Sequence, residues 1–140
     1  MGNKLQGYMK PPTVRKTKKV IISEDFIDPE TNKPLPFTIR TITQKEAKQI
    51  AKKATRTSNS RSGREEVFDR QYYRELIVLA GTVEPDFANS DLCNHYGVLD
   101  PIDCIGEMLS MGEFTKLENA IYDISQLDNL DAIEEEVKNS

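Results

Sequence analysis

The residue types of a zinc site or a Cys–His catalytic pair occur close together at Cys93, His95 and Cys104. A structural zinc site needs four ligands, and its cysteines usually come in close pairs such as Cys-x2-Cys. This chain offers three ligands at loose spacing. Side chains at i and i+2 of one helix also point about 200° apart, which separates Cys93 from His95. We therefore predict neither a metal site nor a catalytic pair, and expect His95 to be a half-buried helix residue.

Carboxylates form the second cluster, at Asp100, Asp103 and Glu107. Paired carboxylates can exchange protons with a substrate or hold a cation. Two of them, however, fall at the start of the helix expected from Asp100-Pro101, where negative charge stabilises a helix without any catalytic role. The chain also carries no glycine-rich phosphate loop and no G-x-S-x-G motif. We predict that the protein is not an enzyme and needs no cofactor.

Charge is distributed unevenly along the 140 residues, whose formal net charge is −4. Residues 1–70 hold 16 Lys and Arg against 8 Asp and Glu, a balance of +8, whereas residues 71–140 hold 3 against 15, a balance of −12. Such a chain can attract copies of itself or a partner of complementary charge. The alternative is that the two charges only solvate separate faces of the molecule.

Nucleic-acid binding is a rival interpretation of the basic half. Lys10–Lys19 and the basic face of the helix expected at 45–56 could contact phosphates. However, no aromatic residue lies between Phe37 and Phe68 to stack on bases, and the acidic half would repel phosphate. We therefore expect no nucleic-acid partner.

No stretch of the chain is apolar enough to span a membrane. The longest uninterrupted apolar run is Leu76–Ala80, well short of the roughly 18 residues that a span requires. The N-terminus lacks the apolar region of a signal peptide. We therefore expect a cytoplasmic protein with reduced cysteines and no membrane partner.

The spacing of apolar residues predicts a mainly α protein: a small helical domain of about four to five helices with an N-terminal β-hairpin packed on it. We place this single globular domain at residues 18–127. It lies between a flexible basic arm at 1–17 and an acidic C-terminal segment at 128–140, which becomes helical when something covers its apolar stripe. The hairpin is expected from Val20–Ile22 and the alternating run Phe37–Ile42.

Local signals set the helix boundaries. Thr43 and Glu46 form a capping-box pattern at the start of a basic helix. The segment Thr57–Gly63 has no apolar residue and is expected to be a mobile loop. The next helix should begin near Glu65-Glu66, be buried in its second half, and end at Gly81.

Two segments are the candidate partner-binding surfaces, because each carries apolar groups where the fold is least able to bury them. The first is a short turn after the central helix, and the second is one stripe of the acidic C-terminal segment. The candidate residues are Glu84, Pro85, Asp86, Phe87, Leu130, Ile133 and Val137.

From about Phe37 onward the chain resembles the XkdN-like tail assembly chaperones of phages and defective prophages with contractile tails. The resemblance covers roughly 100 positions, and the order and spacing of its motifs carry it. They are TIRTITQ at 38–44, Phe68-Asp69, Tyr72, LIVLAGTVEPDF at 76–87, Tyr96-Gly97-Val98, Asp100-Pro101, Met108-Leu109 and Gly112-Glu113-Phe114.

The resemblance implies a non-enzymatic role in tail morphogenesis, with no catalytic residues to carry over. Such chaperones bind the long, helical, aggregation-prone tape measure protein and keep it soluble before tail tube subunits polymerise around it. It implies the tape measure protein as partner, the tail tube protein as a further candidate, self-association, and a place in the bacterial host cytoplasm but not in the mature virion. The alternatives are a structural tail completion or connector protein, which stays in finished particles, and a small nucleic-acid-binding protein.

Overall fold

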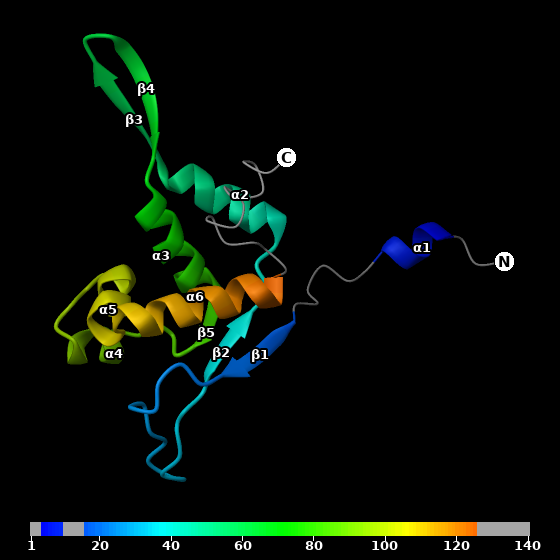
Figure 1. Ribbon diagram of the computed structural model, residues 1–140, viewed down its shortest axis with the longest axis vertical. Helices are drawn as coiled ribbons and strands as arrows, with labels where there is room; N and C mark the ends of the chain where they lie inside the picture. Colours follow the sequence, from blue (N-terminus) through cyan, green and yellow to red (C-terminus); the bar gives the residue numbers. More distant parts are fainter. Residues whose placement is uncertain (1–3, 10–15, 126–140) are drawn as a thin grey trace.

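The computed structural model describes residues 4–9 and 16–125, which contain six helices and five strands. In chain order the elements are α1 (Lys4–Tyr8), β1 (Thr17–Val20), β2 (Phe37–Arg40), α2 (Gln44–Lys53), β3 (Thr55–Ser60), β4 (Gly63–Phe68), α3 (Arg70–Gly81), β5 (Thr82–Glu84), α4 (Ser90–His95), α5 (Pro101–Met108) and α6 (Met111–Ser125). Figure 1 shows an elongated molecule in which a sheet and the helices α2 to α6 form the body and a hairpin projects from one end.

The central sheet has the strand order β1-β2-β5, and both pairs are antiparallel. The first two strands pair as predicted, with Thr17 opposite Arg40 and Val20 opposite Phe37. The first strand is Thr17–Val20, however, and not the predicted Val20–Ile22. Phe37 and Ile39 alternate with more exposed neighbours and face the core, as a period of two requires. Helix α6 contacts β1 and β2 and so covers this face of the sheet.

Helix α3 is the centre of the helical layer and contacts α2, α5 and α6. Its second half is buried, as expected, and Ile77 and Val78 are fully enclosed. Gly81 ends the helix, and its Cα faces Ile121 of α6 so closely that a side chain there would collide with it. The capping box is also confirmed: Thr43 caps α2 by accepting from the Glu46 backbone N–H while Glu46 accepts from that of Thr43.

A polar network joins α3 to α6 inside this layer. The Arg74 guanidinium donates to both carboxylate oxygens of Glu118 at distances of 2.9 to 3.1 Å. The Tyr122 hydroxyl donates to the same carboxylate at 2.9 Å. Burial, and then the nearby charge of Glu118, raise the pKa of Tyr122. The carboxylate is therefore satisfied by charged and neutral donors although it is buried.

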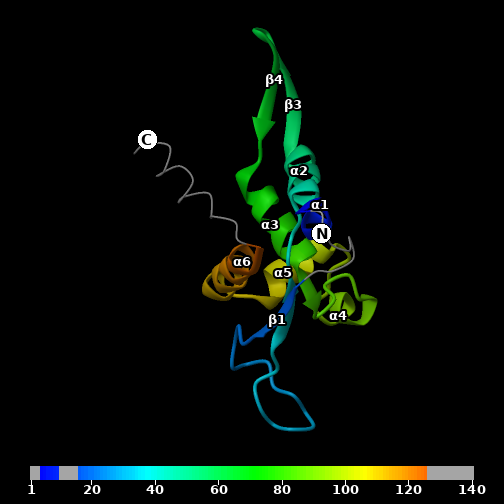
Figure 2. The same ribbon diagram turned by 90° about the vertical axis from the view of Figure 1, so that its right-hand side faces the viewer.

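The segment expected to be a mobile loop is instead a β-hairpin. Strands β3 and β4 pair from Thr55 opposite Phe68 to Ser60 opposite Gly63. Gly63 has φ of 121°, a conformation that glycine adopts easily at a tight turn. Figures 1 and 2 both show the hairpin extending away from the body. Its residues are nearly all exposed, so it has no buried face and leaves no apolar alternation in the sequence.

The mainly α prediction is therefore wrong, because the described residues form an α+β structure with five strands in two antiparallel sheets. Two features account for the error. The all-polar hairpin carries no periodic signal, and β5 is a three-residue strand that follows α3 directly. Glu65 and Glu66 lie in β4 and not, as predicted, at the start of a helix. The next helix, α3, begins at Arg70 and is capped by Asp69. The predicted division into arm, domain and acidic segment stays a prediction.

Candidate partner-binding groove

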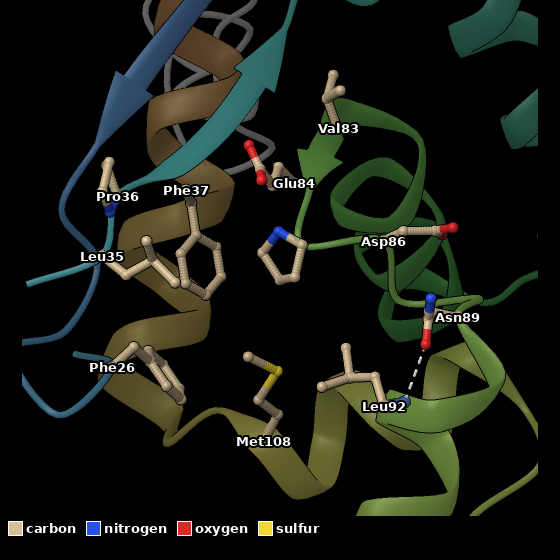
Figure 3. A pocket seen from close by; sticks show the side chains of 11 residues that line it. Phe26, Leu35, Pro36, Phe37, Val83, Glu84, Asp86, Asn89, Leu92 and Met108 are labelled. Atoms are coloured by element: carbon tan, nitrogen blue, oxygen red, sulfur yellow. Dashed lines mark hydrogen bonds between the residues drawn. The ribbon is translucent and has the colours of Figure 1, made fainter. Parts of the chain in front are cut away.

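An open apolar groove lies where the end of β5 meets α4 and the long connection between β1 and β2. We refer to it as the β5–α4 groove, and its volume is about 600 Å³. Figure 3 shows side chains from four separate parts of the chain arranged around it. The lining residues are Phe26, Leu35, Pro36, Phe37, Val83, Glu84, Pro85, Asp86, Asn89, Leu92 and Met108.

Aromatic packing forms the floor of the groove. The Phe37 ring is only 2% exposed, and its centroid lies 5.6 Å from that of Phe26 and 6.4 Å from that of Phe87. Both pairs are tilted, a favourable geometry for neighbouring rings. Strand β2 fixes the backbone of Phe37, so the floor is part of the hydrophobic core and is not a mobile surface.

Caps and turns fix the wall formed by residues 84–92. The Asn89 side chain accepts from the backbone N–H groups of Asp91 and Leu92, which caps α4 and holds Leu92 at the groove (Figure 3). The Asp86 carboxylate accepts from the backbone N–H of Ala88 at 3.0 Å. These bonds make the wall a pre-formed surface.

Apolar side chains that reach solvent give the groove its binding potential. Leu35 is 45% exposed and Val83 is 49% exposed, and they belong to different segments. The charged residues in the lining are the exposed carboxylates of Glu84 and Asp86, and this lining contains no Lys or Arg. The groove therefore suits an apolar segment that carries a positive charge beside its anchor residues.

The structure separates the sequence-predicted site residues into three groups. Glu84, Pro85 and Asp86 line the β5–α4 groove together. Phe87 is 1% exposed and packs in the core beneath it, so it supports the groove but is not accessible to a partner. The predicted residues of the acidic segment, Leu130, Ile133 and Val137, lie outside the described residues.

Sequence reasoning missed the far wall of the groove. Phe26, Leu35 and Pro36 come from the connection between β1 and β2, which the sequence marks only as rich in turn formers. Leu92 and Met108 lie on helical stripes that resemble ordinary core positions. The one local signal of this wall was Leu35, because it is an apolar residue between two prolines and belongs to no periodic helix or strand pattern.

The two cysteines and the histidine first considered for covalent or metal chemistry lie in different environments. Cys93 and Cys104 are buried, and the Cys93 thiol donates to the Phe87 carbonyl oxygen at 3.1 Å. Burial, and then the neighbouring Cys93 thiol, raise the pKa of Cys104 to about 11. His95 is exposed, contrary to the expectation of half-burial. Its ring packs edge-on against the Tyr96 ring, with 4.8 Å between the two ring centroids.

The carboxylate cluster caps a helix, as predicted. Asp100 accepts from the backbone N–H of Ile102 at 2.8 Å, with Pro101 as the first residue of α5. Burial, and then the nearby acidic groups Asp69, Asp103 and Asp100, raise the pKa of Glu75. Within residues 4–9 and 16–125, acidic, Cys and His side chains form no cluster of three or more that could hold a metal ion. Over the same ranges, no helix has the length and hydrophobicity that crossing a membrane requires.

Comparison with known proteins agrees with the sequence resemblance. Residues 5–138 match the model of the phage XkdN-like tail assembly chaperone protein family. The chain belongs to this family. It is 33% identical to the protein XkdN of the phage-like element PBSX of Bacillus subtilis (strain 168), over 124 residues that make up 86% of this chain and 83% of that protein.

Two further similarities concern YqbN. Over 124 residues the chain is 32% identical to the uncharacterised protein YqbN of Bacillus subtilis (strain 168), which again covers 86% of this chain and 83% of the relative. A crystal structure of the protein YqbN matches with a TM-score of 0.72 and 25% identity, covering 91% of this chain and all of that one. The α+β architecture described above is therefore shared with an experimentally determined structure.

Proposed function

We propose that this XkdN-like tail assembly chaperone binds the phage tape measure protein through the β5–α4 groove and keeps it soluble while the tail is built. Family membership supports the assembly role. The observation that carries the finer proposal is the groove itself, a pre-formed apolar surface with two carboxylates in its lining. A long helical protein presents apolar side chains along its length until other subunits cover them, and such side chains fit a groove of this kind.

The energetics allow transient binding at each groove. Complete burial of one aliphatic side chain contributes about 1.5 to 3 kcal/mol. Two or three anchors therefore supply about 3 to 9 kcal/mol, most of which is offset by the entropy lost on association, about 4 kcal/mol or more. Single sites of this strength release the partner readily, while many copies along one tape measure protein hold it firmly. A chaperone that must leave before the tail is complete needs this combination.

Co-expression of this chain with its cognate tape measure protein tests the proposal. We expect a soluble complex containing many copies of the chaperone per tape measure protein, with the stoichiometry measured by light scattering. The decisive variant is Leu35→Asp, which places a charge in the β5–α4 groove at a residue that is already 45% exposed. We expect at least about tenfold weaker binding, equivalent to about 1.4 kcal/mol.

Leu99→Asp is the matched control, because Leu99 is 94% exposed and does not line the groove. It makes the same chemical change and should bind as the parent chain does. Equal binding by both variants would remove the groove from the proposal. If the tape measure protein aggregates in the presence of the parent chain, the chaperone role itself fails.

Mass spectrometry of purified tails separates the chaperone from a structural connector or completion protein. The chaperone acts in the host cytoplasm and should be absent from finished particles. Its recovery at a fixed number of copies per particle would favour the structural role. Retention on DNA that falls steeply with salt would instead favour the nucleic-acid-binding alternative.

A further inference from the structure

A second groove, between α2 and α3, shares no lining residue with the β5–α4 groove. We refer to it as the α2–α3 groove, and its volume is about 530 Å³. Ile50 and Ala80 give it an apolar floor, and the aliphatic parts of longer side chains on α2 form its wall. Its lining residues are Glu46, Gln49, Ile50, Lys53 and Ala80. Four of these residues follow helical spacing on one face of α2.

The helix that forms this groove is strongly basic. The exposed lysines of α2 are Lys45, Lys48, Lys52 and Lys53. The one acidic residue of α2, Glu46, is already paired with Arg40, whose Nη2 lies 2.6 Å from the carboxylate Oε2. The ten residues of α2 therefore carry a formal charge of +3, and their own acid is engaged elsewhere. A segment that docks here should be acidic and carry a narrow apolar stripe.

The chain itself delivers such a segment to this place. The hydroxyl of Ser125, the last described residue, accepts from the backbone N–H of Ile42 at 2.8 Å, two residues before α2 begins. Residues 126–140 continue from this point with five acidic residues and one lysine, a balance of −4. As a helix, 15 residues would span roughly 22 Å, compared with roughly 15 Å for the ten residues of α2.

We propose that residues 128–138 dock in the α2–α3 groove of their own chain when no partner is bound. Leu130, Ile133 and Val137, which recur at helical spacing, meet the apolar floor, and the acidic residues meet the lysines of α2. The position of Ser125, the length of the segment and its charge select this occupant over a separate protein. The α2–α3 groove then belongs to a cis contact that neutralises the basic face of the free chaperone.

Zero-length carbodiimide cross-linking of the full free chain tests this contact. The reagent joins a carboxylate to an amine only where the two touch. We expect links between residues 128–136 and Lys48, Lys52 or Lys53, with a yield that falls at least about fivefold at 1 M salt. An equal mixture of ¹⁴N- and ¹⁵N-labelled protein identifies the chain of origin. Links found mainly between differently labelled chains would assign the segment to a second copy and overturn the proposal.

Hydrogen exchange of α2 gives an independent readout. Ile133→Asp removes one apolar contact and should raise exchange of the α2 amides about threefold or more. Ala132→Asp adds the same charge about 100° away on a helix and should leave exchange unchanged. Unchanged exchange in both variants, or an equal rise in both, would refute the docking. These measurements use the free chain, so they are independent of whether the β5–α4 groove binds the tape measure protein.

Discussion

Gly81→Ala is the substitution whose cost the structure defines best. Gly81 ends α3, and a Cβ built there would lie 2.6 Å from Cγ2 and 2.8 Å from Cδ1 of Ile121. Ile121 is 0% exposed, so its side chain cannot move aside without disturbing the core. Overpacking of this kind costs about 1 to 3 kcal/mol, whereas the gain in helix propensity returns at most about 1 kcal/mol. We expect net destabilisation of about 1 to 2 kcal/mol.

Urea denaturation measures this change as a lower midpoint at an unchanged slope, because the surface exposed on unfolding stays the same. Gly106→Ala is the matched control. Gly106 lies within α5, is exposed, and has no heavy atom within 4 Å of the added Cβ, so the same substitution should stabilise the protein by up to about 1 kcal/mol. A Gly81→Ala protein as stable as the parent would refute the steric argument.

A double-mutant cycle isolates the collision itself. Ile121→Ala removes all three side-chain atoms that the new Cβ would meet, and alone it should cost about 2 to 5 kcal/mol. In that background Gly81→Ala fills part of the cavity and should stabilise the protein. The effect of one substitution thus changes sign with its neighbour. Additive effects would show that the destabilisation arises elsewhere.

Three further predictions concern titration, thiol reactivity and capping. The pKa of Tyr122 is raised by burial and then by Glu118, so at alkaline pH the folded state keeps a proton that the unfolded state loses. The free energy of unfolding should therefore fall above about pH 10, by up to about 1.4 kcal/mol per pH unit. Urea unfolding from pH 8 to 11 should show a smaller fall for Tyr122→Phe, and an identical pH profile would contradict the assignment to Tyr122. Cys104, with its pKa raised to about 11, should react with iodoacetamide about a hundredfold more slowly in the native protein than in urea; equal rates would exclude a buried thiol. Thr43→Ala should lower stability by about 1 kcal/mol and Thr43→Ser should not, because serine retains the cap to Glu46; equal losses in thermal unfolding would point to another cause.

Local chemistry made several elements predictable. Thr43 and Asp100 cap helices because their side chains replace hydrogen bonds that the first helical turn lacks, and this depends only on neighbours in sequence. The alternation from Phe37 to Arg40 placed β2 for a similar reason. Strands β3 and β4 were not predicted, because an exposed polar hairpin buries no face and so has no alternation of apolar residues. The three residues of β5 are too few for any period, and their pairing with β2 joins positions more than 40 residues apart.

The sequence by itself determined the family, the caps of α2 and α5, and the buried second half of α3. It could do so because propensity, capping and apolar spacing act over a few residues. Only the tertiary structure decided that Phe87 supports the β5–α4 groove from beneath, and that Leu35 and Leu92 are brought together at it. A groove is made of contacts between distant segments, and such contacts depend on sheet pairing and core packing that no local pattern encodes.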